Sequence, residues 1–384
     1  MFANAARAFL PACFAAALAV APGLVSRSLA SEEPAGRVVR PKPIVEVAFV
    51  LDTTGSMGPL IEGAKRKIWS IATAIVDANP AAEIRIGLVA YRDLGDEYVT
   101  RKFDLTTDIQ DLYANLLELK ARGGGDWPES VNEALEAGVA KLSWTQGADI
   151  CRILFLVGDA PPHMDYAQDT KYPEVIRMAV DRGITVNAVQ AGGARDTERV
   201  WREIAQRGNG RYIPIPQDGG RLLVIETPWD TEIIELQGHI NGTVIPYGPR
   251  SQRSSVEQKT QQLAAAPAPV ATEMAGYLSR NAARTGEAVT GRGDLVADVN
   301  AGRQKLDGMK DDDLPDAFRT MKPAERQAAI DKNTAERKTL NAHLAELVRK
   351  RDQYVEQQRS NAPKQPADSF DRAVADALAV QIKR

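Results

Sequence analysis

The residues best suited to chemistry stand in one short segment, where Asp52, Thr54 and Ser56 occupy alternate positions. Alternate residues in a tight loop can point the same way, so one carboxylate and two hydroxyls can converge on a small volume. Oxygen ligands suit hard divalent cations, above all Mg²⁺, which keeps several of its waters. Gly55 and Gly58 let the backbone turn closely around such an ion. Because these residue types are also common in ordinary loops and helix caps, the segment needs further ligands to define a site.

Two segments downstream supply such ligands. The first is Gly-Gly-Gly-Asp-Trp-Pro-Glu at 123–129, and the second is Leu-Phe-Leu-Val-Gly-Asp-Ala-Pro-Pro at 154–162, a hydrophobic strand that ends in Gly-Asp. With the first segment they resemble the metal-ion-dependent adhesion site of von Willebrand factor A domains, in a version with Asp126 where many members have Thr. The resemblance implies a Mg²⁺ or Mn²⁺ site with the ligands Asp52, Thr54, Ser56, Asp126 and Asp159.

The resemblance also implies how such a site binds a partner. Thr54 and Ser56 would contact the ion directly while Asp52 and Asp159 act mainly through waters, so the ion stays poorly neutralised. An Asp or Glu side chain of a partner protein can then replace a metal-bound water and form a charge-assisted contact. The carboxylate of Asp126 departs from the Thr version and would make the ion less electrophilic. The expected partner-binding rim consists of Arg92, Trp127, Pro161, Pro162, His163 and Met164.

Two of the rim residues have alternative roles. Arg92 falls with Asp93 and Asp96 in a loop at the carboxyl edge of the sheet, where open α/β sheets bind ligands, but a local Arg–carboxylate pair would equally stiffen that loop. His163 can stand near the metal or form hydrogen bonds within the rim loop. Ser56 has no base beside it in its own loop, and the chain lacks a phosphate-binding G-x-x-x-x-G-K-[ST] segment. The sequence therefore predicts binding, with no catalytic residue.

The elements that position these residues follow from the pattern of apolar residues. Residues 45–51 form an apolar, β-branched run that is typical of a central strand covered on both faces. Further strands are expected at 84–91, 98–105 (an antiparallel edge), 151–158, 185–190 and 211–215, and helices at 60–77, 109–119, 128–142, 172–182 and 196–207. Alternating strands and helices imply a doubly wound, mostly parallel α/β sheet with helices on both faces over residues 44–225.

The composition changes after residue 225. We expect residues 226–250 to form a helix and an extended closing segment, and residues 251–269, which are rich in Gln, Ser, Ala and Pro, to form a flexible linker. Residues 270–384 are expected to be a mainly helical C-terminal region. The ending Asn-Gly-Thr at 241–243 with Tyr-Gly at 247–248 resembles a group of bacterial exported A-domain proteins of unsettled role.

A long charged helix is expected from about 321 to 358. Leu344 and Leu347 belong to an apolar seam along it, but Arg337 and Arg351 occupy the same seam. Because a coiled coil sustains its apolar repeat over three or four heptads, we expect instead a helical hairpin that packs on its own domain or on a partner.

The N-terminal residues have the features of a secretory signal peptide. Residues 1–30 combine a weakly positive start, an apolar stretch and small residues before a cleavage point after Ala30. Prolines shorten the apolar stretch below the ~20 residues that a spanning helix needs, so no transmembrane anchor is expected after cleavage. Residues 31–43 are expected to be a linker. The protein is therefore predicted to be periplasmic or secreted.

Charge and cysteine content narrow the function further. The formal net charge of −3 and the pI near 5.8 argue against a nucleic-acid binder. Removing the signal peptide leaves Cys151 alone, so no internal disulfide is expected. The sequence predicts an exported, Mg²⁺-dependent adhesion or scaffold module that captures a partner carboxylate. The alternatives are an accessory subunit of an envelope enzyme or assembly complex and, less favoured, a hydrolase.

Overall fold

The computed structural model describes residues 42–147, 149–220, 225–361 and 370–382. The predicted signal peptide at 1–30 lies outside these residues, as does the predicted linker up to residue 41. None of the described helices combines the length and the apolar character that crossing a membrane requires.

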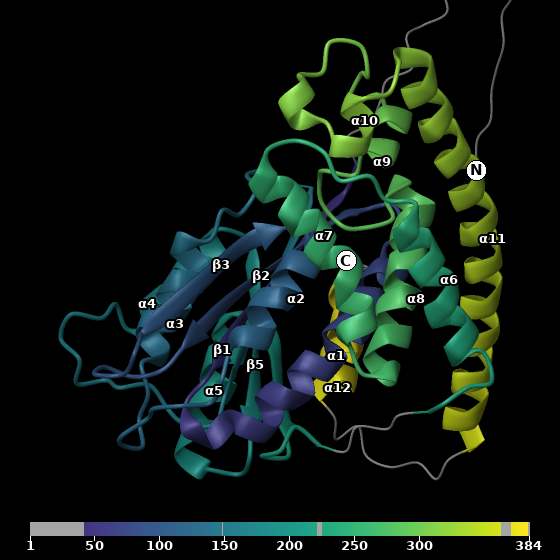
Figure 1. The fold of residues 1–384 in the computed structure, drawn as a ribbon. Helices are drawn as coiled ribbons and strands as arrows, with labels where there is room; N and C mark the ends of the chain where they lie inside the picture. The colour runs from purple at the N-terminus through teal and green to yellow at the C-terminus, as the bar shows by residue number, and fades with distance from the viewer. Residues whose placement is uncertain (1–41, 148, 221–224, 362–369, 383–384) are drawn as a thin grey trace, which may run out of the picture. The chain divides into compact units, whose positions relative to one another are not determined.

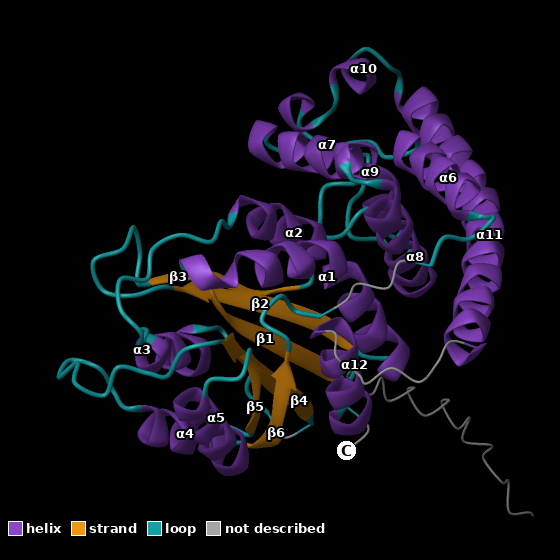
Figure 2. Ribbon diagram, turned by 90° about the horizontal axis from the view of Figure 1, so that it is seen from below, coloured by secondary structure: helices purple, strands orange, loops and turns teal. Residues whose placement is uncertain are grey.

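A six-stranded sheet lies at the centre of the fold, with the strand order β3-β2-β1-β4-β5-β6. Its strands are β1 (Ile44–Asp52), β2 (Glu83–Tyr91), β3 (Thr100–Thr106), β4 (Ile150–Gly158), β5 (Ile184–Ala191) and β6 (Asn209–Ile215). All neighbours are parallel except β3, which is antiparallel to β2. The predicted mostly parallel sheet with an antiparallel edge is therefore confirmed (Figure 2).

Strand β1 is the central strand, since it pairs with β2 on one side and with β4 on the other. Val45 and Val47 belong to the apolar cluster on one face of the sheet, and Ala48 and Val50 to the cluster on the opposite face. The chain runs outward from β1 to β2 and β3 and then returns to β4 beside β1. The carboxyl ends of β1 and β4 therefore form the switch point at which open α/β sheets bind ligands.

Helices cover both faces of this sheet (Figure 2). One face carries α1 (Gly58–Ala78), α2 (Ile109–Glu118) and α12 (Phe370–Gln381), and the other carries α3 (Val131–Glu136), a π-helical turn (Ala137–Lys141), α4 (Tyr172–Asp181) and α5 (Arg195–Arg207). The helix predicted at 128–142 begins later than expected and is α-helical only to residue 136. Its first residues are diverted because Glu129 forms an isolated bridge with Pro162.

The C-terminal region is helical, as predicted. It contains α6 (Asp230–Gly242), α7 (Arg250–Ala265), α8 (Ala268–Thr285), α9 (Leu295–Asn300), α10 (Asp316–Arg319) and α11 (Pro323–Asn361), with a short 3-10 turn at Asp311–Asp313 (Figure 1). The predicted boundaries between these segments as separate domains stay a prediction.

The flexible linker predicted at 251–269 is wrong, because this segment forms α7 and the start of α8. Gln and Ala, which suggested a linker, are also good helix formers. Pro267 caps α8 and Pro269 lies in its first turn, where a missing N–H costs little. Val256 and Leu263 give α7 a buried side, so tertiary packing holds the segment in place.

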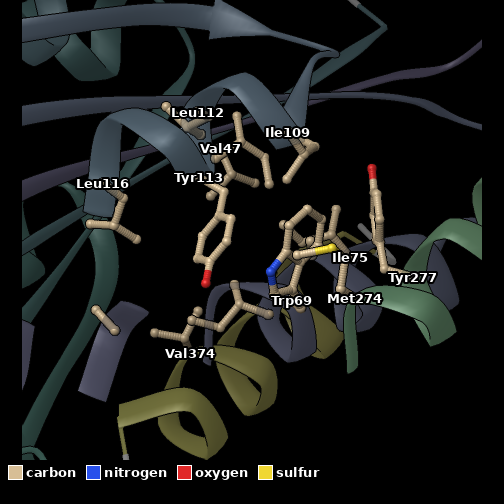
Figure 3. Close-up of a cluster of buried hydrophobic side chains, with 14 of the residues drawn as sticks. Val47, Trp69, Ile75, Ile109, Leu112, Tyr113, Leu116, Met274, Tyr277 and Val374 are labelled. Carbon is tan, nitrogen blue, oxygen red and sulfur yellow. The ribbon is translucent and has the colours of Figure 1, made fainter. Parts of the chain in front are cut away.

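The C-terminal helices share a core with the sheet. Trp69 of α1 is fully buried, and its ring centroid lies 5.2 Å from that of Tyr113 in α2 and 5.4 Å from that of Tyr277 in α8 (Figure 3). Phe370 of α12 reaches Phe49 of β1, with ring centroids 6.4 Å apart. Helices far along the chain therefore complete the apolar cover of this face of the sheet.

Arg337 explains why the apolar seam of the long helix α11 is interrupted. Its guanidinium is buried, where Nη1 donates to Asp294 Oδ2 at 2.7 Å and Nε donates to Thr243 Oγ1 at 2.9 Å. Leu344 and Leu347, on the same helix, belong to the core cluster of the sheet. The helix packs on its own chain, one of the two arrangements that the sequence left open.

Candidate metal centre

The loop after β1 brings together the three oxygen ligands predicted there. Asp52, the last residue of β1, is fully buried, and its Oδ1 accepts hydrogen bonds from the backbone N (2.8 Å) and Oγ1 (2.7 Å) of Thr54. The Oγ1 of Thr54 lies 3.3 Å from Oγ of the exposed Ser56. Since the Thr54 proton is directed to Asp52, the lone pairs of its hydroxyl remain available to an ion.

Asp159 follows the end of β4, next to β1, and faces the same place. Gln217 donates to its Oδ2 at 2.7 Å, and Thr197 donates to its backbone oxygen at 2.9 Å, so the side chain is held firmly. Gly158 leaves room for two side chains at this point, because a Cβ at 158 would lie 2.4 Å from the Tyr91 hydroxyl and 3.3 Å from Asp52 Oδ2. Asp159 is near enough to Asp52 for its charge to raise the pKa of the Asp52 carboxyl.

Glu129 is a third buried carboxylate at this site, and it was not among the ligands predicted from the sequence. Its backbone N donates to the oxygen of Pro161 at 3.0 Å, which turns the side chain inward. A Cβ on Gly124 would lie 2.9 Å from Glu129 Oε1 and 3.1 Å from Cβ of Thr54, so Glu129 and Thr54 border the same space. The available signal was a carboxylate three residues after Asp126 in the same glycine-rich segment.

These three carboxylates have acceptor capacity that the described protein atoms leave unused. Asp52 Oδ2, Glu129 Oε2 and Asp159 Oδ1 are all buried without a hydrogen-bond partner among the described residues. Buried polar atoms are normally paired, and one bound ion is a partner that would satisfy all three oxygens together. Together with the two hydroxyls they form an oxygen-only donor set, which fits Mg²⁺ or Mn²⁺.

The pKa values reflect the same crowding of negative charge. Burial raises the pKa of Asp52 to about 7 against the lowering effect of its Thr54 hydrogen bonds, and neighbouring Asp159 adds to the rise. Burial, with the charges of Asp52, Asp93 and Asp159, raises the pKa of Glu129 to about 9. A divalent cation would lower both pKa values, because it stabilises the ionised carboxylates.

Asp126 was predicted as a ligand of the same ion. In the structure its charged neighbour is His163, outside the group formed by Asp52, Glu129 and Asp159. The Asp126 side chain is 62% exposed, and its Oδ2 lies 3.5 Å from Nε2 of His163. With Asp93 these two residues form a separate group of potential ligands. Among the described residues, the structure therefore gathers Asp52, Thr54, Ser56 and Asp159 with Glu129, and places Asp126 in a neighbouring cluster.

The predicted rim contains both exposed and buried side chains. Trp127 and Met164 are 47% and 50% exposed, and Trp127 Nε1 donates to Asp196 Oδ2 at 2.6 Å. Pro161 is half-buried, whereas Pro162 and His163 are buried. The exposed part of the rim is therefore apolar and aromatic.

Arg92 is buried and supports the loop after β2. Its guanidinium lies 4.3 Å from the ring centroid of Tyr98, and it donates to the backbone oxygen of Lys120 at 2.9 Å and to Glu97 at 3.3 Å. These contacts match the local Arg–carboxylate pair that the sequence left open, although the partner is Glu97 and not Asp93 or Asp96.

Comparison with protein families matches residues 46–225 to the von Willebrand factor A domain. The chain therefore contains a von Willebrand factor A domain, as the three loops and the doubly wound sheet indicate. A domain of this class indicates a role in protein interaction or adhesion.

Curated relatives share part of this domain. An ariadne-like RING finger protein of Acanthamoeba polyphaga mimivirus is 31% identical over 123 residues, which are 31% of this chain and 11% of the relative. The von Willebrand factor A domain-containing protein 7 of Rattus norvegicus is 37% identical over 123 residues, 31% of this chain and 12% of the relative. An alpha-protein kinase of Dictyostelium discoideum is 27% identical over 129 residues, 33% and 20% of the two chains. The similarity spans a fifth or less of each relative.

Solved structures show more distant similarity. The pilus adhesin SpaC of Lactobacillus rhamnosus GG has a TM-score of 0.36 at 16% identity, covering 46% of this chain and 29% of the adhesin. An aerotolerance-related membrane protein of Bacteroides fragilis has a TM-score of 0.32 at 16% identity, covering 57% of this chain and 99% of that protein.

Proposed function

We propose that this chain is an exported, cation-dependent protein-binding module whose A domain captures an acidic side chain of another protein. The observation that carries the proposal is the set of buried, unpaired carboxylate oxygens of Asp52, Glu129 and Asp159 beside two hydroxyls. Export is proposed from the signal-like composition of residues 1–30.

The residues that would hold the ion are those at the ends of the two central strands. Thr54 and Ser56 offer neutral hydroxyl oxygens, Asp52 and Asp159 offer carboxylates already fixed by hydrogen bonds, and Glu129 completes the set. A bound Mg²⁺ or Mn²⁺ would supply a positive centre for a partner carboxylate. Because Asp52, Thr54 and Asp159 are held by hydrogen bonds before the ion arrives, these three donors need little reorganisation to bind it.

The surroundings of the site suit a protein partner. Ser56 is exposed, so the ion would be accessible from solvent on that side. The exposed Trp127 and Met164 can exclude water around a central charged contact, and large aromatic side chains are enriched among interface residues that dominate affinity. These features support binding of an acidic side chain that is flanked by apolar residues.

We propose binding and not catalysis as the role of this centre. The exposed hydroxyl of Ser56 has Thr54 as its described side-chain partner, and no general base contacts it within the described residues. A nucleophile normally needs such a base within hydrogen-bond reach. Turnover that survives purification and disappears in an Asp159→Ala variant would instead support a hydrolase.

Calorimetry with the purified full chain tests the metal part of the proposal. Mg²⁺ and Mn²⁺ should bind the wild-type protein, and binding should be lost in the double variant Asp52→Ala, Ser56→Ala. A matched control is Asp181→Asn, which alters an exposed carboxylate paired with Arg177 on α4. Unchanged Mg²⁺ binding in the double variant would overturn the site.

Affinity capture from an envelope extract tests the partner part. A specific partner should be retained with Mg²⁺, released by EDTA and retained again when Mg²⁺ returns. Losing a central charge-assisted contact of roughly 1.5–3 kcal/mol corresponds to more than tenfold in affinity. A partner that binds equally well in EDTA, or binds the Asp159→Ala protein with unchanged affinity, would refute a role for the ion.

A further inference from the structure

A second group of potential metal ligands lies beside the centre described above. Asp93, Asp126 and His163 come from three different loops, and each offers a ligand atom within 4.8 Å of the others. Asp93 follows β2, Asp126 lies in the glycine-rich loop before α3, and His163 follows β4. All three therefore belong to the carboxyl edge of the sheet, where this fold places ligands.

His163 is held in one orientation by its surroundings. The residue is 5% exposed, its ring stacks on Tyr166 with centroids 4.0 Å apart, and its backbone oxygen accepts from Asn132 Nδ2 at 2.6 Å. Its backbone N donates to the oxygen of Glu129 at 3.1 Å. The imidazole ring cannot turn freely, so the direction of its two nitrogens is set by the fold.

The two ring nitrogens of His163 have different partners. Nδ1 lies 2.9 Å from Asp165 Oδ1, whereas Nε2 is buried without a hydrogen-bond partner among the described residues. A proton on Nδ1 that is donated to Asp165 leaves the lone pair of Nε2 directed at the other two carboxylates. A carboxylate behind one nitrogen and an open lone pair on the other is the usual arrangement of a metal-bound histidine.

The distances around Nε2 also fit a shared ion. Nε2 lies 3.6 Å from Asp93 Oδ2 and 3.5 Å from Asp126 Oδ2, which is too long for hydrogen bonds. Two ligand atoms that each lie ~2.1 Å from a tetrahedral metal are roughly 3.4 Å apart. The observed separations thus match ligand-to-ligand contacts around one ion better than direct ion pairs.

Asp93 is oriented as a ligand by its own partners. Ser130 Oγ donates to its Oδ1 at 2.8 Å, and the hydroxyl of Tyr166 donates to its Oδ2 at 2.9 Å. Asp126 differs, because its side chain is 62% exposed and gives the group an open side toward solvent. Two fixed, buried ligands and one exposed ligand provide both a prepared site and an entry path for an ion.

We propose that Asp93, Asp126 and His163 bind a second divalent cation of the transition-metal class, with Zn²⁺ as the best fit. One imidazole with two carboxylates differs from the oxygen-only donors of the first centre, and imidazole favours Zn²⁺ and its neighbours over Mg²⁺. Asp126 would then bind a different ion from the one predicted from its place in the sequence. It does not depend on the first centre binding metal.

Cobalt provides a spectroscopic test on the full chain. Metal is removed with EDTA, the protein is saturated with Mg²⁺, and Co²⁺ is titrated while visible absorption is recorded. We expect one equivalent of Co²⁺ to bind with an imidazole–carboxylate spectrum and to be displaced by Zn²⁺. Wild-type protein that is folded by circular dichroism but binds no Co²⁺ under these conditions would overturn the proposal.

Variants separate the second site from the first. Asp126→Asn and His163→Gln should each lower Co²⁺ affinity at least tenfold, and Asp126→Asn should fold normally because its side chain is mostly exposed. Asp165→Asn, which leaves all three ligands in place, should weaken Co²⁺ binding about 10–100-fold through the loss of its support of His163. The matched control Asp52→Asn should lose Mg²⁺ binding and retain Co²⁺ binding. Co²⁺ affinity that is unchanged by Asp126→Asn, or lost in Asp52→Asn, would refute a separate site.

Discussion

Strand β1 carries a fully buried carboxylate near each end, and the two have opposite surroundings. Glu46, near the start of the strand, receives hydrogen bonds from Thr145 through both its backbone N and its hydroxyl, and Arg85 and Arg152 lie within 4.0 Å. Asp52, at the other end, also receives a backbone N and a hydroxyl from one threonine, Thr54. The Tyr91 hydroxyl also lies beside it, and the charged neighbours that affect its pKa are carboxylates instead of arginines.

The difference lies in what surrounds the second oxygen of each group. Both oxygens of Glu46 have donors or positive charge nearby, whereas Asp52 Oδ2 has no hydrogen-bond partner in the described part of the chain. Asp159 adds repulsion at the Asp52 end. A buried carboxylate that stabilises a fold normally has donors or positive charge at both oxygens. A carboxylate that is available to bind a cation has an oxygen with no donor. The same strand therefore has one end whose carboxylate is fully supplied with donors and another end, at the proposed metal centre, whose carboxylate is not.

The largest expected effect is a contrast in stability between the two ends. Glu46→Gln should cost roughly 3–5 kcal/mol, because the buried Arg152 loses its counter-charge and the new amide group meets the donors of Thr145. Asp52→Asn should change the free energy of unfolding by less than about 1 kcal/mol in EDTA, since the amide oxygen still accepts from Thr54 while repulsion from Asp159 ends. Urea unfolding of both variants measures this contrast.

Equal losses in the free energy of unfolding for Glu46→Gln and Asp52→Asn would contradict the difference between the two ends of β1. A loss of several kcal/mol in Asp52→Asn without metal would mean that this carboxylate also serves the fold. The Asp181→Asn variant, with its exposed ion pair on α4, gives the baseline for a change of surface charge.

The next effect is the response of stability to metal. An ion that binds only the folded chain adds about 2.7 kcal/mol when its concentration is one hundred times its dissociation constant. Mg²⁺ should therefore raise the urea midpoint of the wild-type protein and should not change the urea midpoint of the Asp52→Asn protein. Glu46→Gln should start from a lower stability and gain the same increment, because its defect lies at the opposite end of β1.

If Mg²⁺ raised the urea midpoint of Asp52→Asn as much as that of the wild-type protein, the ion would have to bind at a site other than this centre. If Asp126→Asn abolished the response, the sequence-based assignment of Asp126 to the first ion would stand, and the separate second site would lose its ligand.

The sequence predicted those parts of the centre that depend on local geometry. Asp52, Thr54 and Ser56 lie within one five-residue stretch, so their spacing alone indicates convergence, and Asp159 follows the end of an easily recognised strand. The doubly wound sheet followed from the alternation of apolar runs, because period and order carry that information. The confirmed fold thus rests on patterns that are visible residue by residue.

The remaining features depend on contacts between distant segments. Which of two carboxylates in the glycine-rich loop turns inward is decided by the bond from Glu129 to Pro161, 32 residues further along the chain by their numbering. The role of Arg337 required Asp294, and the helix α7 required a surface on which to bury Val256. Spacing along the sequence does not specify such pairings, so Glu129 was missed and the linker was wrong.

The smallest effect compares the two threonines that serve the buried carboxylates. Thr145→Val removes a hydroxyl donor from Glu46, near the start of β1. It should lower the free energy of unfolding by about 1.5–3 kcal/mol, as expected for the loss of a hydrogen bond to a charged group. It should not change the Mg²⁺ affinity. Thr54→Val removes the corresponding donor from Asp52 and should cost only about 1 kcal/mol in EDTA, because Asp52 has a pKa near 7 and can take up a proton. Mg²⁺ affinity of Thr54→Val should fall at least about tenfold, since the same hydroxyl is a proposed ligand. Urea unfolding and calorimetry on both proteins measure these values, and a Thr145→Val protein that lost Mg²⁺ binding would show that the two ends of β1 are not independent.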